Sequence, residues 1–134
     1  GTLGYVIANP KVGERFTEFY ILGLEGKAED YPETLKVGEE GKVILGIVNH
    51  EHERVNYRVE VKIDGGKAKL RVGGEDRDTI EVELNHEKKW EGEVGFVPRK
   101  IGTKQKVEFV LYKEGKPYFK DPPHLWVDVE ESRS

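Results

Sequence analysis

Residues 55–63 alternate strictly between apolar and polar side chains. The apolar positions share one parity and are Val55, Tyr57, Val59, Val61 and Ile63. A period of two with one apolar side predicts a half-buried β-strand. The preceding residues 42–48 form a denser apolar run, rich in β-branched side chains, which is typical of a central strand. Because the connecting residues 49–54 are few and polar, we predict a sequential, antiparallel pair of inner strands.

The rest of the chain predicts further short strands separated by turn residues. They cover residues 5–8, 16–22, 67–72, 79–84, 90–97, 105–112, 117–119 and 125–129. Asp64-Gly65-Gly66 and the turn around Gly115 indicate hairpins, because glycine tolerates the positive φ of such turns. Residues 73–78 and 98–104 are expected to be polar loops. Trp90 falls on the apolar parity of its strand, and we expect it in the core.

About seven to nine short strands with no helical periodicity predict an all-β fold. The architecture that fits best is an immunoglobulin-like or fibronectin-like antiparallel β-sandwich, and a closed barrel is the alternative. With 134 residues the chain is expected to form one domain, 1–134, with a core large enough to need no staples. There is no cysteine, so neither disulfides nor a cysteine-bound metal stabilises the fold.

Composition narrows the classes of partner. The net charge of −4 is mild and mixed in sign, without the basic footprint that nucleic-acid binding needs. Charged residues make up 36% of the chain and Gln occurs only at Gln105, a bias typical of thermophiles. No apolar run reaches the roughly 18 residues of a membrane-spanning helix. Because the sequence contains no methionine, we expect it to be processed or to be a domain of a longer protein.

No catalytic residues and no cofactor site are expected. The only serines are Ser132 and Ser134, near the C-terminus, and without cysteine a catalytic triad or dyad has no nucleophile within the fold. Phosphate-binding and dinucleotide-binding glycine motifs are absent from the sequence. Glutamates at two-residue spacing, as in Glu81 and Glu83, alternate with apolar residues and indicate a solvated sheet face.

Two segments raise the question of a metal ion. His50 and His52 lie two residues apart, and on a strand they would share a face and could bind one ion. A polar loop in which Asn49 bonds the turn backbone explains the same residues more simply. Asp76 and Asp78, with Glu75, could hold calcium weakly, but they lack the calcium-loop glycine and distal glutamate. We therefore assign no metal site, and leave open whether either segment binds an ion.

Aromatic residues offer one candidate binding surface. Trp126 falls on the parity opposite to its apolar neighbours, so its side chain is predicted to face outward. A surface for stacking on a sugar or a partner protein would combine Trp126 with Tyr118, Phe119, Tyr31 and Tyr112. The alternative is that Trp126 covers a sheet edge or packs on Pro122-Pro123, since single exposed aromatic side chains are common.

Several longer segments resemble one family. They are FTEFYILG (Phe16–Gly23), GKAEDYP (Gly26–Pro32), VGEEGKVILGIVNHE (Val37–Glu51), VNYRVEV (Val55–Val61), KKWEGEVGFVP, VEFVLYKEG and HLWVDV. Together they resemble the archaeal domain of unknown function 1616, found in predicted membrane proteins. The resemblance implies membrane helices followed by a β ectodomain on the outer (extracellular) face of the cell membrane. Residues 1–12 would lead in from a membrane segment outside this chain, and residues 130–134 would be a disordered tail.

The resemblance brings no activity, cofactor or site residues. Our leading hypothesis is a non-enzymatic ectodomain that acts as an interaction or structural module of the cell envelope. Its expected partner is an envelope protein or another copy of itself. Nucleic acid is not expected as a partner. The alternative is a carbohydrate-binding module that holds a glycan on Trp126, Tyr118 and Phe119. A metal-dependent hydrolase that uses His50 and His52 is the third hypothesis.

Overall fold

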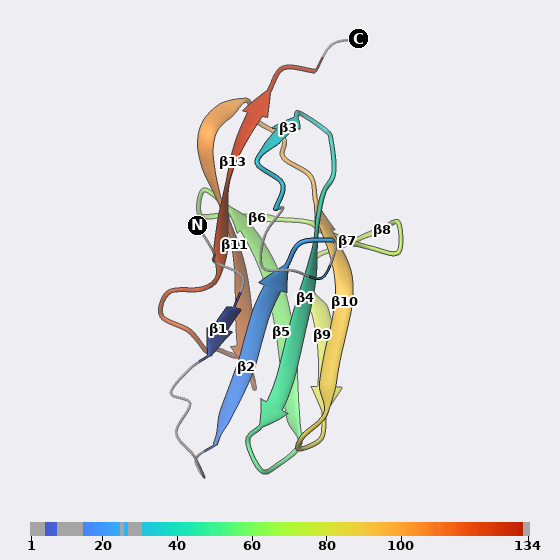
Figure 1. Cartoon of the computed structure of the whole chain (residues 1–134), viewed down its shortest axis with the longest axis vertical. Coiled ribbons are helices and arrows are strands. Elements are labelled where there is room, and N and C mark those ends of the chain that lie inside the picture. Colours follow the sequence, from blue (N-terminus) through green and yellow to red (C-terminus); the bar gives the residue numbers. More distant parts are fainter. Residues whose placement is uncertain (1–4, 8–14, 25, 27–30, 133–134) are drawn as a thin grey trace.

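The structure, a computed structural model, describes residues 5–7, 15–24, 26 and 31–132. Within these residues the chain forms thirteen β-strands in two sheets, of six and seven strands. One sheet lies in front of the other in Figure 1, so the predicted all-β sandwich is confirmed and a closed barrel is not formed. No helix in the described part has the length and apolarity to cross a membrane. The expected lead-in is described only at residues 5–7, and the expected tail ends outside the described residues.

The six-stranded sheet is antiparallel throughout. In spatial order it contains β1 (Tyr5–Ile7), β2 (Phe16–Leu22), β4 (Gly41–His50), β10 (Lys89–Phe96), β7 (Leu70–Val72) and β8 (Glu75–Arg77). Its interior strand β4 is the predicted apolar run, flanked by β2 and β10. Because β4 is paired on both sides, its backbone groups are satisfied over most of its length.

The seven-stranded sheet contains the alternating strand that dominates the sequence. In spatial order its strands are β3 (Thr34–Lys36), β13 (His124–Glu130), β11 (Gly102–Lys113), β5 (Val55–Ile63) and β6 (Gly66–Ala68), with β12 (Lys116–Pro117) on β11 and β9 (Ile80–Leu84) on β5. The only parallel pair among the described strands is β3 with β13. β3 has no counterpart among the predicted strands, because three residues carry too little alternation to be recognised.

Both predicted hairpins are confirmed. Asp64 and Gly65 have φ values of 49° and 83°, and they connect β5 to β6. Glu114 and Gly115 have φ values of 48° and 83°, and they connect β11 to β12. Two successive positive φ values characterise the tight turn whose twist matches that of the paired strands.

The predicted inner pair of strands is corrected by the structure. β4 and β5 are consecutive, but they belong to different sheets and form no ladder with each other. The short polar segment between them is therefore a crossing from one sheet to the other, not a hairpin turn. A polar connection that bridges two layers carries the same sequence signal as a hairpin loop, so periodicity alone does not separate the two.

A second crossing divides the predicted strand 67–72. β6 pairs with β5 in one sheet and β7 pairs with β10 in the other, so the chain changes sheets at Lys69. The predicted polar loop 73–78 is also partly wrong, because β8 returns antiparallel to β7 after a turn at Gly73-Gly74. All three residues of β8 are exposed, which explains why apolar patterning did not indicate a strand.

The apolar faces of the two sheets meet in one core. Its buried side chains include Phe19, Ile21, Val43, Leu45, Ile47, Val59, Val61, Val107, Phe109 and Leu111. Phe96 and Phe109 pack edge to face between the sheets, with ring centroids 6.2 Å apart. Burial of each such side chain stabilises the fold by about 1.5–3 kcal/mol relative to exposure.

Trp90 does not take the central place that its parity predicts. It is partly buried and packs against the core from its border. β7 pairs with β10 only at Gly95 and Phe96, so the Trp90 end of β10 is an edge of the sheet. The indole lies over Gly92, where an added Cβ would stand 2.8 Å from the ring. A large side chain at a sheet edge shields the core instead of filling it.

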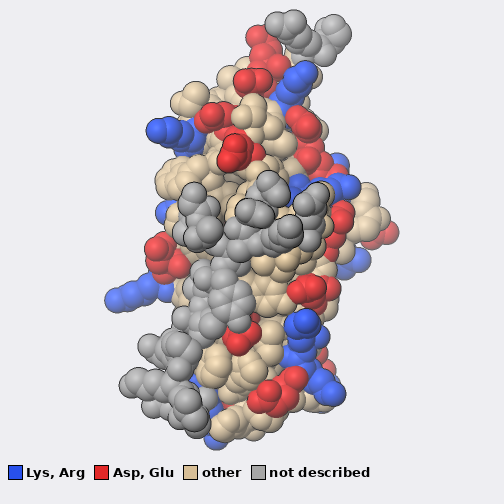
Figure 2. All heavy atoms as spheres, in the orientation of Figure 1, with Lys and Arg blue, Asp and Glu red and all other residues tan. Residues whose placement is uncertain are grey.

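Acidic and basic side chains are interspersed over the surface. The face shown in Figure 2 has no continuous area of one sign, in agreement with the mild net charge of −4. A place where charges of one sign do gather is therefore a candidate site for a charged ligand.

Candidate functional site

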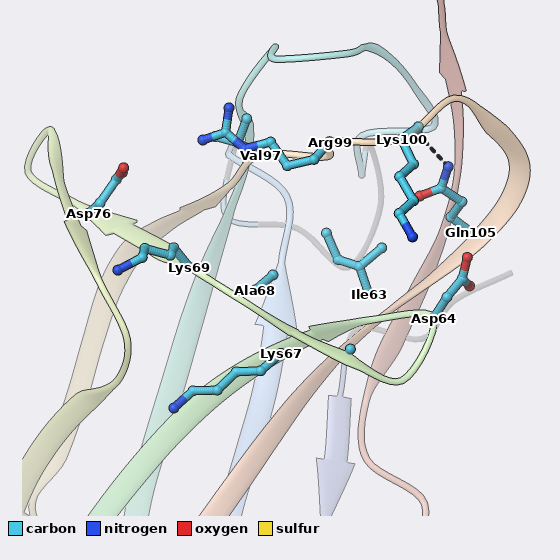
Figure 3. Close-up of a pocket in the computed structure, with 11 residues that line it drawn as sticks. Ile63, Asp64, Lys67, Ala68, Lys69, Asp76, Val97, Arg99, Lys100 and Gln105 are labelled. Carbon is cyan, nitrogen blue, oxygen red and sulfur yellow. Dashed lines mark hydrogen bonds between the residues drawn. The ribbon is translucent and has the colours of Figure 1, made fainter.

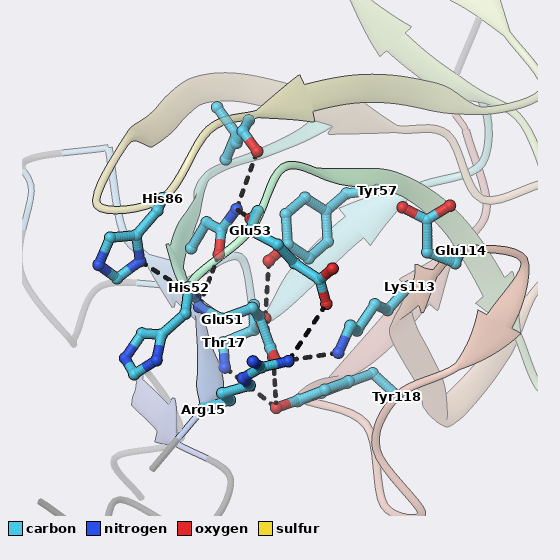
Figure 4. A network of polar contacts seen from close by, with 12 residues as sticks. Arg15, Thr17, Glu51, His52, Glu53, Tyr57, His86, Lys113, Glu114 and Tyr118 are labelled. Atoms are coloured by element: carbon cyan, nitrogen blue, oxygen red, sulfur yellow. Dashed lines mark hydrogen bonds and ion pairs between the residues drawn. The ribbon is translucent and has the colours of Figure 1, made fainter. Parts of the chain in front are cut away.

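A buried carboxylate lies at the end of the sandwich where β4 crosses to β5. Glu51 is 3% exposed, although sequence analysis placed it in a solvated loop. Its carboxylate accepts hydrogen bonds from Thr17 Oγ1 at 2.8 Å, Lys113 Nζ at 2.9 Å and Tyr118 OH at 3.2 Å (Figure 4). Thr17 belongs to β2 and Lys113 to β11, so one carboxylate connects both sheets.

Asn49 holds the crossing segment in place. Its side-chain oxygen accepts the backbone N–H of Glu51 at 2.7 Å, and its Nδ2 donates to the carbonyls of Glu53 and Leu84, both at 2.8 Å. Asn49 is fully buried, so these bonds satisfy an amide that water does not reach. The predicted bonding of the turn backbone by Asn49 is confirmed, and it directs the Glu51 side chain inward.

Tyr57 completes what we call the Glu51 network, formed by Thr17, Glu51, Tyr57, Lys113 and Tyr118. The Tyr57 hydroxyl lies 2.7 Å from Thr17 Oγ1, and the backbone N–H of Thr17 donates to Tyr118 OH at 3.0 Å. Burial raises the pKa of both tyrosines. Burial alone would also raise the pKa of Glu51, but the hydrogen bonds from Lys113 and Thr17 outweigh it and lower that pKa.

The Glu51 network is suited to hold the two sheets together, and we call it the clamp in this role. At neutral pH its carboxylate is ionised and its two phenols are neutral, each at the protonation state that its neighbours favour. A general acid or base needs a pKa near the working pH and an open path to a substrate. A buried carboxylate with a lowered pKa and three donors already in place has neither, so the network fixes the sheets relative to each other.

The histidines at the same end point toward different partners. His50 packs its ring on Phe16 with centroids 4.7 Å apart, and its nitrogens lie 3.5 Å from Glu18 and 3.2 Å from Glu87. The strand ends at His50, and His52 has a positive φ of 65°, which breaks the two-residue period assumed for a shared face. The His52 ring instead meets that of His86 edge on, at 4.9 Å. In the described part of the chain, no three His, Asp or Glu side chains converge as metal ligands.

The acidic residues considered for calcium each meet a separate cation. Asp76 accepts a hydrogen bond from Arg71 Nε at 2.8 Å, and this bond is the main cause of its lowered pKa. Asp78 lies 3.1 Å from Lys69. The two carboxylates thus belong to two separate ion pairs, and Glu75 lies 3.6 Å from a third cation, Arg77.

The five candidate stacking residues do not gather on one surface. The Tyr112 hydroxyl donates to Glu60 at 3.1 Å, and the Arg58 guanidinium lies over its ring. Trp126 is 51% exposed on the outward side of β13, as its parity predicts, with the His124 ring edge on at 5.6 Å and Lys106 Nζ 5.8 Å above the indole. Tyr118 and Phe119 pack against the core instead, and Phe119 stacks on Phe19 at 6.2 Å. The Tyr31 hydroxyl donates to the carbonyl of Ile21 at 2.9 Å, with its pKa raised by burial.

A pocket opens at the opposite end of the sandwich. This Lys100 pocket has a volume of about 490 Å³, and Ile63, Ala68, Val97, Arg99, Lys100 and Gln105 contribute to its lining (Figure 3). Sequence analysis did not identify it, because its residues come from the β5–β6 hairpin and from the β10–β11 loop, which are separated along the chain. The only sequence signal is the adjacent pair of cations in the expected loop 98–104.

Comparison with solved structures supports the fold. The chain resembles the crystal structure of the CARDB domain of a Pyrococcus furiosus protein in complex with di-metal ions, with 12% identity, a TM-score of 0.58, and coverage of 91% of this chain and 99% of that one. The solution NMR structure of the same domain gives 13% identity and a TM-score of 0.55, with coverage of 84% and 94%. At these identities the likeness establishes the β-sandwich alone.

No curated protein matches the sequence. The model of one protein family does, over residues 10–128, which is most of the chain. That family is described as Domain of unknown function (DUF1616), the family whose motifs the sequence resembles. The chain therefore belongs to the DUF1616 family.

Proposed function

We propose that this domain is a non-catalytic interaction module of a longer membrane protein, exposed on the outer face of the cell membrane. The family resemblance motivates the location, and the immunoglobulin-like sandwich is an architecture in which recognition is separable from catalysis. The Glu51 network supports the non-catalytic role, because its buried carboxylate is fully occupied by donors from within the fold.

Trp126 is the observation that carries the interaction role. Its indole is 51% exposed on a strand whose alternate residues, Leu125 and Val127, are buried in the core. β13 therefore holds the backbone around Trp126 in place, so that binding has to order little more than the indole side chain itself. Tryptophan is enriched among the residues that dominate binding energy at protein interfaces. The partner that we propose is an envelope protein, of which a second copy of this domain is the simplest case.

Sedimentation velocity over a range of protein concentrations tests the simplest case. We expect the wild-type domain to self-associate, Trp126→Ala to remain monomeric, and Ile101→Ala to behave like the wild type. Ile101 is 63% exposed and lies outside β13, so it controls for the loss of any exposed apolar side chain. A monomeric wild type at all concentrations, or equal association of Trp126→Ala, would contradict self-association through this surface.

A carbohydrate-binding module is the second candidate. Trp126 favours it too, because the His124 ring and the Lys106 ammonium border the indole and could donate hydrogen bonds to sugar hydroxyls. Tyr118, Phe119 and Tyr31 would not take part, since they pack against the core. A glycan screen should then give binding that Trp126→Ala abolishes and Trp126→Phe partly retains. Binding that is indifferent to both changes would remove this candidate.

The metal-dependent hydrolase finds less support. The Pyrococcus furiosus domain was crystallised with di-metal ions, but His50 and His52 of this chain face Glu87 and His86 respectively. Elemental analysis of the purified domain for transition metals is the direct test, and a stoichiometric metal that is lost in His50→Ala would revive the idea.

A further inference from the structure

The Lys100 pocket is bordered by the segment in which the chain changes sheets, at Lys69. β6 ends in the seven-stranded sheet at Ala68, and β7 begins in the six-stranded sheet at Leu70. The loop from β10 to β11 forms the facing wall. The resulting volume of about 490 Å³ lies within the usual range of small-ligand pockets.

Positive charge gathers around this pocket in a chain whose net charge is −4. Its cationic lining residues are Lys67, Lys69, Arg99 and Lys100, and its acidic ones are Asp64 and Asp76. Lys67 lies 3.9 Å from Glu60 and Lys69 lies 3.1 Å from Asp78, so those two cations already have counter-ions. Figure 3 shows the Lys100 side chain running down beside Ile63, while Arg99 reaches along the rim toward Asp76. Exposed positive charge that no ion pair neutralises attracts an anion.

The two carboxylates are already engaged in hydrogen bonds of the fold. Asp64 Oδ1 accepts the backbone N–H of Lys106 at 2.9 Å, and Asp76 accepts from Arg71 at 2.8 Å. Arg99 and Lys100, by contrast, take part in none of the ion pairs formed within the described part of the chain. Arg99 faces Asp76 and helps to lower the pKa of that carboxyl, after Arg71. Lys100 is therefore the cation of this loop that is most available to an anionic group from outside.

The rest of the lining is suited to a partly apolar, hydroxylated body. Ile63, Ala68 and Val97 supply aliphatic surface at the base of the pocket. Gln105 is only 6% exposed, and its Nε2 donates to the carbonyl of Lys100 at 2.7 Å, which fixes the amide. The other end of that amide, Oε1, accepts no hydrogen bond within the described residues and offers an acceptor for a hydroxyl.

We propose that the Lys100 pocket binds a small hydroxylated carboxylate of the uronic acid class. The carboxylate is held by Lys100, a ring hydroxyl donates to Gln105 Oε1, and the C–H face of the ring lies on Ile63 and Val97. A monoanion fits this setting better than a phosphate dianion, because Asp64 and Asp76 at the border repel a second negative charge. The pocket lies on the inward side of β11 and is independent of the surface around Trp126.

Titration of the ¹⁵N-labelled domain with glucuronate, followed by two-dimensional NMR, tests the proposal. We expect saturable shifts of the backbone amides of Arg99, Lys100 and Gln105, and no such shifts with glucose, which lacks the carboxylate. Lys100→Ala should weaken the affinity by about tenfold, the effect of losing one charge-assisted hydrogen bond. Lys116→Ala, an exposed cation in the β11–β12 hairpin at the other end, should leave the affinity unchanged.

Several results would overturn the proposal. Equal shifts with glucose would remove the anionic requirement, and equal shifts with inorganic phosphate at the same concentration would reduce the pocket to an unselective anion site. An unchanged affinity of Lys100→Ala would also refute the assigned contact, and Lys100→Gln checks this with a side chain of similar length. Lys100 is exposed, so both variants should keep a wild-type NMR fingerprint, which the same spectra verify.

Discussion

At one end of the sandwich the carboxylate of Glu51 is 3% exposed and receives three hydrogen bonds, one of them from an ammonium group. At the other end Arg99 and Lys100 stand in solvent beside a pocket and form none of the described ion pairs. β5 runs from one end to the other, so the two regions are about 25–30 Å apart on a common scaffold. In the first region the polar groups join the two sheets, whereas in the second the Lys100 ammonium forms no ion pair within the described residues.

The cause of the difference is the way in which each chain crossing is made. Between β4 and β5 the crossing is anchored by the buried amide of Asn49, which draws the polar chain into the interior. Between β6 and β7 the crossing at Lys69 has no buried polar anchor among the described residues, and Lys69 itself is exposed. The free energy of unfolding is therefore expected to depend on the end that holds the Glu51 network, which we call the closed end. Ligand recognition is expected to depend on the end that holds the Lys100 pocket, the open end.

Removal of the clamp should have the largest effect. Glu51→Ala deletes the acceptor of three hydrogen bonds and leaves Lys113, Thr17 and Tyr118 without it, which should lower the free energy of unfolding by about 3 kcal/mol. Urea denaturation measures the change. Glu53→Ala is the matched control, because Glu53 is exposed and its ion pair with Arg15 is long, at 3.8 Å. That variant should stay within about 0.5 kcal/mol of the wild type, and a similar loss in both would break the comparison.

Removal of the anchor should have the next largest effect. Asn49→Ala leaves the backbone N–H of Glu51 and two carbonyls without their buried partner, at an expected cost of about 2–3 kcal/mol in urea denaturation. Combined with Glu51→Ala, the loss should be smaller than the sum of the two single losses, because Asn49 acts by positioning Glu51. Full additivity of the two changes would show that the anchor and the clamp are independent.

The strands of the core could be predicted from the sequence, since β2, β4, β5, β9, β10 and β11 all lie where apolar patterning places them. Side chains that fill the water-free layer between the sheets recur at every second residue of a strand. The alternation in the sequence therefore indicates which positions are buried. The assignment of β4 and β5 to different sheets could not be predicted in this way. It depends on where a short polar connection leads, and that is decided by Asn49 and by contacts between distant strands.

The Glu51 network and the Lys100 pocket could not be predicted from the sequence, because each is formed by residues that lie far apart along the chain. Glu51 lies within a run of charged and polar residues, and nothing local distinguishes it from its exposed neighbour Glu53. Its burial follows from Thr17, Lys113 and Tyr118, which lie at least 34 residues away along the chain. The outward direction of Trp126, by contrast, was predicted correctly, because parity on a single strand is a local property.

Acid should weaken the clamp selectively. The pKa of Glu51 in the folded state lies below its ordinary value of 4.5, so the folded protein binds this proton less readily than the unfolded chain. The stabilisation is therefore complete above the unfolded pKa and is lost as the pH falls through the folded one. The gap in unfolding free energy between the wild type and Glu51→Gln should be largest near neutral pH and should narrow below about pH 4. A gap that stays constant would mean that the charge of Glu51 contributes nothing.

The smallest effect on stability is expected at the open end, where Lys100→Ala removes an exposed cation that no described ion pair uses. Surface substitutions of this kind usually change the free energy of unfolding by no more than about 0.5 kcal/mol. The sign should be toward stabilisation, because Lys100 forms no described ion pair and shares the pocket with other cations, so its loss relieves repulsion between like charges. Urea denaturation at low ionic strength measures this most sensitively, since salt screens the repulsion between exposed charges. A loss above about 1 kcal/mol would identify Lys100 as a structural residue and remove the contrast between the two ends. Unchanged or raised stability, together with weakened glucuronate binding, would show that Lys100 serves ligand binding and not stability.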